Sequence, residues 1–362
     1  MKTKIAIFGI TGSIGQQALE VISKENFELV GFTYFNNYSK ALEIKKMFPN
    51  AFVFSTKNTS LNNVSSYQEM IEKSKPDIIL NSIVGFAGLE ITILAIQNNI
   101  DIALANKESL VVAGWFINDL LKKSKSKIYP VDSEHTSIYE LIKNNDKQID
   151  EIIITASGGP FFEKNIDEIK SASFQEAIKH PNWTMGYKIS IDSATLMNKC
   201  FEIIECFYLF NIRKIKAIRH KQSYVHGILK FKDNSYQMAS SYPDMKLAIQ
   251  QGITKFRSNT EIIKEIDFTN LLFNFETINQ DLWIPIKWAY EFLETNNKVL
   301  PIILNAANEE AIELFKNNKI NFLDITRIIQ ENIVEFKELK INNLNDIYFV
   351  DSLIRNKIRK EY

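Results

Sequence analysis

A glycine-rich turn near the N-terminus constrains the fold of this chain more than any other feature. Residues 5–8 form a short apolar run typical of a buried parallel strand. Residues 9–15 follow with glycine at every third position, and an amphipathic pattern begins after them. In this order, the backbone of the turn can approach a pyrophosphate, which the helix N-terminus would bind. The spacing is GxxGxxG and not the commoner GxGxxG, so the alternative is a tight turn that merely needs glycine.

Strands and helices continue to alternate through the first third of the chain. Further strands are predicted over residues 27–35, 51–55, 78–82 and 101–105. This alternation predicts a doubly wound parallel sheet, in which ligands bind beyond the carboxyl ends of the strands. The turns at 106–108 and 132–134 are therefore expected to face one crevice. Lys107 could equally be an ordinary surface lysine.

Two carboxylates, Asp132 and Glu134, follow a short predicted strand at 127–129. In an extended segment, residues two apart point the same way. Carboxylates aimed at one point repel unless a cation lies between them or one keeps a proton. The pattern therefore indicates either a hard divalent cation or an acid/base pair. The plain alternative is a helix N-terminus, since Asp, Ser and Glu all suit a first turn.

The middle of the chain offers an anion site and a loop with large side chains. A predicted strand at 152–156 is followed by Ser157 and two glycines, which would make an anion cradle or only a turn. A loop over 180–186, bracketed by proline and glycine, carries Trp183. This tryptophan could be pinned in a core, but His180 three residues earlier favours a lid that closes over an anion.

A helix is expected to begin at Asp192 or Ser193, which would cap it. Asn198, Lys199 and Glu202 then share one helical face. They could be an ordinary polar group on a solvated face. Alternatively, Glu202 adds a third carboxylate to the pair at 132–134, and the oxygen ligands would suit Mg²⁺ or Mn²⁺.

Composition bounds the class of protein. The 362 residues predict two or three domains, and 43 basic and 43 acidic residues balance, which argues against a nucleic-acid partner. No apolar run reaches the length of a membrane span, and no room for a signal peptide precedes the first strand. The two cysteines, Cys200 and Cys206, are expected to be buried thiols of a cytoplasmic protein.

Six segments resemble the 1-deoxy-D-xylulose 5-phosphate reductoisomerase family. They are GITGSIG (9–15), ALANKESLVVAG (103–114), PVDSEHTSIYE (130–140), ITASGGPF (154–161), HPNWTMGYKISIDSATLMNKCFEIIE (180–205) and LNAANEEAI (304–312). The resemblance implies a metal-dependent rearrangement of 1-deoxy-D-xylulose 5-phosphate and its reduction by NADPH to 2-C-methyl-D-erythritol 4-phosphate, a step of non-mevalonate isoprenoid precursor synthesis. It also implies an α/β fold with a Rossmann-like NADPH domain (1–130), a catalytic domain (131–270) and a helical C-terminal domain (280–362), in a homodimer.

The resemblance assigns roles to individual residues. The implied ligands of Mn²⁺, Mg²⁺ or Co²⁺ are Asp132, Glu134 and Glu202. The implied NADPH contacts are Thr11, Gly12, Ser13, Ile14, Asn36, Asn106, Glu108 and Gly186. The implied contacts to the phosphorylated sugar are Lys107, Ser133, Glu134, Ser157, His180, Ser193, Asn198, Lys199 and Glu202. Catalytic roles are implied for Lys107, His180, the three metal ligands and Trp183, the last as a lid residue.

The main departure from the family pattern lies after the second predicted strand. Phe35 stands where the family usually has a lysine near the adenosine ribose, and the sequence leaves neutral donors such as Thr33 and Asn36 with Lys40 as the nearest cation. We expect NADPH to be preferred over NADH by a reduced margin. The rival interpretations are a metal-free Rossmann dehydrogenase acting on another phosphorylated carbonyl and a nucleotide sensor without catalysis.

Overall fold

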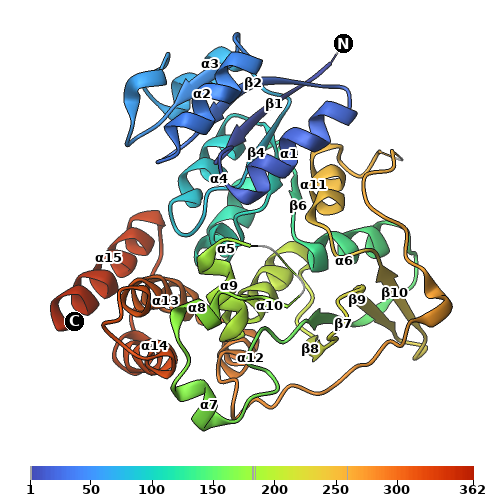
Figure 1. Cartoon of the computed structure of the whole chain (residues 1–362), viewed down its shortest axis with the longest axis vertical. Helices are drawn as coiled ribbons and strands as arrows, with labels where there is room; N and C mark the ends of the chain where they lie inside the picture. The colour runs from blue at the N-terminus through green and yellow to red at the C-terminus, as the bar shows by residue number, and fades with distance from the viewer. Residues whose placement is uncertain (1, 182, 184, 259) are drawn as a thin grey trace. The chain divides into compact units, whose positions relative to one another are not determined.

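A six-stranded parallel sheet and a four-stranded mixed sheet organise the chain, as the computed structural model shows (Figure 1). The structure describes residues 2–181, 183, 185–258 and 260–362. The chain divides into two compact units. The first unit comprises Met1–Asn106, Ile117–Glu140 and Asp244–Glu265; the second comprises Lys107–Phe116, Leu141–Pro243 and Ile266–Tyr362. The α/β class predicted from the sequence is confirmed, whereas the division into three domains stays a prediction.

The first unit contains the parallel sheet and the helices that cover it. Its elements are β1 (Thr3–Phe8), α1 (Ser13–Lys24), β2 (Phe27–Thr33), α2 (Tyr38–Met47), β3 (Phe52–Phe54), η1 (Thr59–Leu61), α3 (Tyr67–Ser74), β4 (Ile78–Asn81), α4 (Gly88–Gln97), β5 (Asp101–Leu104), β6 (Ile128–Pro130) and α11 (Met245–Ile253). Helix α5 (Lys107–Leu121) and helix α6 (Ser133–Lys143) each have residues in both units. Every strand predicted in this region exists, and its observed ends differ from the predicted ones by two residues at most.

The strand order of the first sheet is β3-β2-β1-β4-β5-β6, with every neighbouring pair parallel. The central strand β1 is an apolar run because both faces of the sheet are covered, and Ile5 to Phe8 are fully buried. The order reverses between β1 and β4, so the switch point lies beside the glycine turn that follows β1. Helix α11, which comes from far along the chain, packs against α1 at this sheet (Figure 1).

The second unit combines the mixed sheet with a set of helices. Its elements are β7 (Ile149–Ala156), α7 (Ile166–Lys170), α8 (Phe174–Ala177), α9 (Tyr187–Ala194), α10 (Met197–Phe210), β8 (Ile215–Arg219), β9 (Val225–Phe231), β10 (Tyr236–Ser240), η2 (Phe268–Asn270), α12 (Pro285–Thr295), α13 (Leu300–Lys316), α14 (Phe322–Phe336) and α15 (Leu344–Glu361). In the sheet, β7 pairs with β8 in parallel and with β9 in antiparallel, and β10 pairs with β9.

Helix α10 is the central helix of the second unit. It is apolar around most of its surface, and Phe201, Ile203 and Ile204 are fully buried. It packs against α9 and α12, while α13 packs against α14 and α15 (Figure 1). Lys199, Glu202 and Glu205 of α10 are therefore held in a buried environment, while Asn198 is half-buried. Among the described helices, none combines the length and apolar character needed to cross a membrane.

Candidate functional site

The glycine turn after β1 has the backbone geometry of a phosphate-binding turn. Gly9 has φ +87°, and a Cβ there would lie 2.8 Å from the Ser82 carbonyl oxygen, so only glycine fits. Gly12 is the N-cap of α1 and makes no side-chain cap, which leaves the first turn without a side-chain acceptor. Thr11, Gly12, Ser13 and Ile14, the predicted cofactor contacts, are exposed or half-buried here. These features fit a dinucleotide pyrophosphate.

Asn106 holds the loop that follows β4. Its side-chain amide donates to the carbonyl oxygens of Ile83 (2.7 Å) and Gly85 (2.8 Å). The residue is buried, and its side chain packs so closely on Gly88 that a Cβ there would lie 2.3 Å from the Asn106 Cγ. Asn106, predicted as a cofactor contact, thus also fixes the turn at the end of β4.

The pair Asp132 and Glu134 lies at the start of α6, in the first unit. The Asp132 carboxylate accepts hydrogen bonds from the backbone N–H groups of Glu134 (3.2 Å) and His135 (3.4 Å), as a capping residue does. The prediction that an extended backbone aligns the two carboxylates is wrong, because the helix begins at Ser133. The helix turn nevertheless keeps one oxygen of Asp132 within 4.8 Å of one of Glu134. Ser133, a predicted substrate contact, donates from its hydroxyl to Glu134 (2.5 Å).

In the second unit, Glu202 is the centre of a buried polar cluster. Lys107 Nζ lies 2.9 Å from Glu202 Oε1 and 2.8 Å from Asn198 Oδ1. Lys199 pairs with the other carboxylate oxygen, and the Asn198 amide donates to Glu202. Lys107, Lys199 and Glu202 are each less than 10% exposed. The predicted common face of α10 is confirmed, and the alternatives of a solvated face and of a surface lysine at 107 are wrong.

A second buried ionic cluster surrounds Lys188. Its ammonium pairs with Glu108 (2.5 Å) and with Asp192 (2.9 Å), and Asp192 also accepts a hydrogen bond from Asn308 (2.7 Å). Burial alone would raise the pKa of Glu108, but the charge and hydrogen bond of Lys188 hold that pKa below its usual value. Burial alone would lower the pKa of Lys188, and the carboxylates of Asp192 and Glu108 raise it instead.

The prediction that Asp192 or Ser193 caps the following helix is wrong. Both residues lie inside α9 and are buried, and α10 begins only at Met197 with no side-chain cap. The reason is that Lys188, one helical turn earlier, and Asn308 bind the Asp192 carboxylate. The roles of Lys188 and Asn308 were missed from the sequence; the i,i+4 spacing of Lys188 and Asp192 was the one local signal.

Several residues predicted for the phosphate pocket lie together in the second unit. Gly159 has φ +67°, and a Cβ there would come within 2.7 Å of the Ser193 carbonyl oxygen, so the Ser-Gly-Gly turn fits closely against α9. Ser157 Oγ lies 2.9 Å from His180 Nε2. The turn is thus more than a strand end. It places a hydroxyl and an imidazole side by side next to the helix that carries Ser193.

The hydrogen bonds of His180 define its tautomer. The Trp183 backbone N–H donates to Nδ1 (3.0 Å), so the neutral ring carries its proton on Nε2 and donates to Ser157. Burial lowers the pKa of His180 to about 4. The imidazole is therefore neutral at neutral pH when no anion is bound.

We expect the His180 ring to titrate with a midpoint near its lowered pKa of about 4, which NMR of the imidazole protons would measure. The folded protein then binds this proton less readily than the unfolded chain, so the stabilisation is complete above the ordinary pKa of 6.5 and is lost as pH falls towards 4. A midpoint at or above 6.5 in the free protein would contradict this environment for His180.

The predicted lid over 180–186 is described in part. Asn182 and Thr184 lie outside the described residues. Trp183 is half-buried, with its ring 6.4 Å from that of His226. Gly186, a predicted cofactor contact, is the exposed N-cap of α9. The lid function stays a prediction.

Several of the residues that the sequence predicted for a ribose site, at and after the end of β2, have partners within the protein. Thr33 is 3% exposed, and its hydroxyl accepts a hydrogen bond from the Gly9 N–H (2.9 Å), so it supports the glycine turn. Asn37 caps α2, and Lys40 pairs with Glu43 (3.4 Å). Asn36 is exposed, as a ligand contact would be.

The strand order, the switch point and the glycine turn place the first unit in the class of dinucleotide-binding folds. Comparisons with known proteins identify the family. Family models of 1-deoxy-D-xylulose 5-phosphate reductoisomerase, of its C-terminal domain and of a further DXP reductoisomerase C-terminal domain match residues 5–114, 128–210 and 240–357.

Similar proteins agree along nearly the whole chain. The 1-deoxy-D-xylulose 5-phosphate reductoisomerase of Malacoplasma penetrans is 58% identical over 96% of this chain and 92% of that protein. The enzyme of Mycoplasmoides gallisepticum is 39% identical over 96% of both chains. A solved DOX-P reductoisomerase in complex with NADPH, fosmidomycin and magnesium is 30% identical, with a TM-score of 0.92 over 99% of this chain and 98% of that one. The solved Zymomonas mobilis reductoisomerase in complex with NADPH has a TM-score of 0.87 over 99% of this chain and 98% of that one. The chain belongs to the 1-deoxy-D-xylulose 5-phosphate reductoisomerase family.

Proposed function

We propose that this protein catalyses the NADPH-dependent and metal-dependent conversion of 1-deoxy-D-xylulose 5-phosphate into 2-C-methyl-D-erythritol 4-phosphate. The observation that carries the proposal is the 58% identity to a reductoisomerase over 96% of the chain. The buried cluster around Glu202 adds chemical support, because lysine, amide and carboxylate groups in a dry environment suit a polyhydroxylated, phosphorylated substrate.

The first unit would hold NADPH, which supplies the hydride for the reduction. The turn at Gly9 and the open start of α1 fit its pyrophosphate. Asn106 would act by keeping the β4 loop in place beside the cofactor. The Glu108 carboxylate is held in one position by its ion pair with Lys188. Glu108 would therefore contact NADPH from a fixed position.

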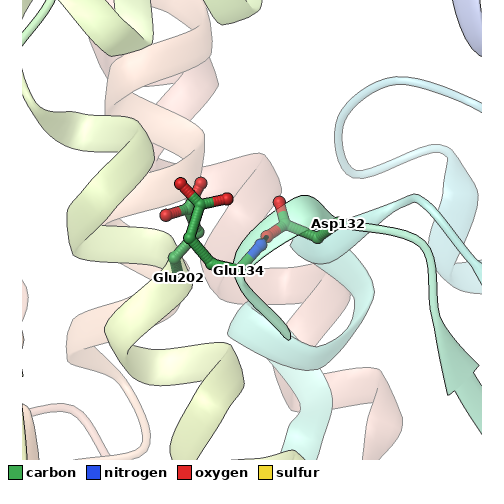
Figure 2. Close-up of side chains that lie close together, drawn as sticks. All are labelled: Asp132, Glu134 and Glu202. Carbon is green, nitrogen blue, oxygen red and sulfur yellow. Dashed lines mark hydrogen bonds between the residues drawn. The ribbon is translucent and has the colours of Figure 1, made fainter. Parts of the chain in front are cut away.

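Asp132, Glu134 and Glu202, the carboxylates drawn in Figure 2, would hold the divalent cation, as the likeness to the reductoisomerases implies. Their oxygens are the ligands that Mg²⁺ and Mn²⁺ prefer. When bound, such a cation stabilises negative charge on the substrate's carbonyl and hydroxyl oxygens. Lys107 and Lys199 would hold the Glu202 carboxylate in position, and their ammonium groups would bind substrate oxygens.

The phosphate of the substrate would be bound by Ser157, His180, Ser193, Asn198 and Lys199. The Ser157 hydroxyl and the His180 imidazole already lie 2.9 Å apart, so these two side chains would lose little conformational freedom when the phosphate binds. Trp183 would close over the substrate and exclude water from the aldehyde. Full activity of Trp183→Ala would remove Trp183 from the catalytic site.

Two further expectations belong to this proposal. The enzyme would act as a homodimer in the cytoplasm; both of its cysteines are buried free thiols, as a reducing compartment favours. Sedimentation of the purified chain at assay concentration would test the dimer, and a monomer with full activity would overturn it.

We expect the purified protein to oxidise NADPH with 1-deoxy-D-xylulose 5-phosphate, to lose this activity with a chelator, and to regain it with Mn²⁺. The absorbance of NADPH follows the reaction, and product identity is checked by mass spectrometry. Activity that persists after chelation would favour a metal-free dehydrogenase. Cofactor binding without oxidation would favour a sensor.

A further inference from the structure

An aromatic ring and a lysine that follow two neighbouring strands meet at the carboxyl edge of the first sheet. Phe35, just beyond the end of β2, is 57% exposed. Lys57, in the segment after β3, places its Nζ 5.0 Å from the centroid of the Phe35 ring. This distance is within the range of a cation–π interaction, which favours an ammonium above the ring face.

The segment that carries Lys57 is fixed by hydrogen bonds. The Ser55 hydroxyl, on a residue 1% exposed, accepts from the backbone N–H groups of Lys57 (3.3 Å) and Asn58 (3.1 Å). Tyr34, the residue before Phe35, donates its hydroxyl to the Asn58 carbonyl oxygen (2.5 Å). The backbone of Lys57 is therefore anchored next to the end of β2, and the exposed ammonium lies over the Phe35 ring.

The end of β2 is where dinucleotide-binding sheets distinguish the two nicotinamide cofactors. A carboxylate there binds a ribose 2′-hydroxyl, and a basic group there binds a 2′-phosphate. This chain has no acidic residue between Thr33 and Lys40. Lys40 lies on α2 with its ammonium beside the Glu43 carboxylate. This negative charge weakens the attraction of Lys40 for a phosphate.

We propose that Lys57, oriented by the Phe35 ring, binds the 2′-phosphate of NADPH and makes this chain selective for NADPH over NADH. The inference rests on the proposed function, since it concerns the same cofactor. The cation comes from the segment after β3, while an aromatic residue occupies the position after β2. The ammonium and a phosphate dianion form a charge-assisted hydrogen bond, which NADH cannot form.

Binding measurements without substrate test the assignment. The variant Lys57→Met keeps an apolar side chain against Phe35 and removes the charge, and Lys40→Met is the matched control. Fluorescence titrations give the Kd of NADPH and of NADH, and calorimetry gives those of 2′,5′-ADP and 5′-ADP. We expect Lys57→Met to raise the Kd of NADPH and of 2′,5′-ADP about tenfold and to leave the Kd of NADH and of 5′-ADP unchanged. Lys57→Arg should retain most of the preference for NADPH over NADH. Added salt should weaken NADPH binding less in Lys57→Met than in the parent.

The outcomes separate this inference from the proposed function. A parent protein that binds neither cofactor would overturn both. A parent that prefers NADPH, with an unchanged preference in Lys57→Met, would overturn only the role of Lys57. Equal weakening of NADPH and NADH would also overturn it, because it would show a structural effect of the side chain. A loss of preference in Lys40→Met would assign the phosphate to α2 instead.

Discussion

Replacing Glu202 by Gln is expected to lower turnover about 10²–10³-fold, a loss of the size found when one preorganised electrostatic contact is removed from an active site. The physical reason is that Glu202 is less than 2% exposed and balances two lysines, Lys107 and Lys199. An amide keeps the shape of the side chain but supplies neither a charge for the cation nor a partner for both ammonium groups. Asp132→Asn and Glu134→Gln are expected to act in the same direction. Steady-state NADPH oxidation at saturating Mn²⁺ measures the loss.

A matched control and a binding measurement make this prediction specific. Glu140→Gln changes an exposed carboxylate on α6, the helix that also carries Glu134, and should leave turnover unchanged. NADPH affinity should be near that of the parent in all four variants, while Mn²⁺ affinity falls in the three site variants. Near-normal turnover in one of these would remove that residue from the proposed metal site.

Replacing Lys188 by Met is expected to destabilise the fold by about 3–5 kcal/mol, the cost of leaving a buried ionic partner uncompensated. Glu108 and Asp192 are both less than 10% exposed and both pair with this one ammonium. Methionine fills a similar volume but leaves two carboxylates without their cation. Urea unfolding at neutral pH measures the change in the free energy of unfolding.

The pH dependence of the Lys188→Met variant checks the cause. In the parent, Lys188 lowers the pKa of Glu108, so this contribution to stability is present above the ordinary carboxyl pKa and is lost as pH falls. Without Lys188, burial raises that pKa, so the variant gains relative stability as pH falls and loses it as pH rises. Lys40→Met, which removes an exposed ion pair, should change stability by only about 0–1 kcal/mol. A Lys188→Met variant as stable as the parent would show that the carboxylates reach water.

The sequence predicted the parallel strands well because local patterns determine them. An apolar run such as 5–8 can be buried on both faces only inside a covered sheet. The turn after it needs glycine, because Gly9 has a positive φ and no room for a Cβ. The start of α10 was predicted wrongly for the opposite reason. Asp192 has the chemistry of a cap, but the partners that bind it include Asn308, more than a hundred positions away.

The candidate site shows the same division between local and distant information. The common face of Asn198, Lys199 and Glu202 follows from helical spacing, and it was predicted. The burial of that face, and the position of Lys107 against it, depend on packing between segments that no local pattern records. The alternative of a solvated face was for this reason as reasonable from sequence as the correct one.

The contact between Lys57 and Phe35 bears on how this fold can change its cofactor during evolution. Strand β3 is one of the two edge strands of the sheet, and the segment after it is largely exposed. Substitutions in such a segment disturb little packing, so a positive charge can be gained or lost there at small cost to folding. A lineage could then vary the residue after β2 while the charge persists at the same place in space. Inspection of the position after β2 alone would in that case assign such a lineage the wrong coenzyme.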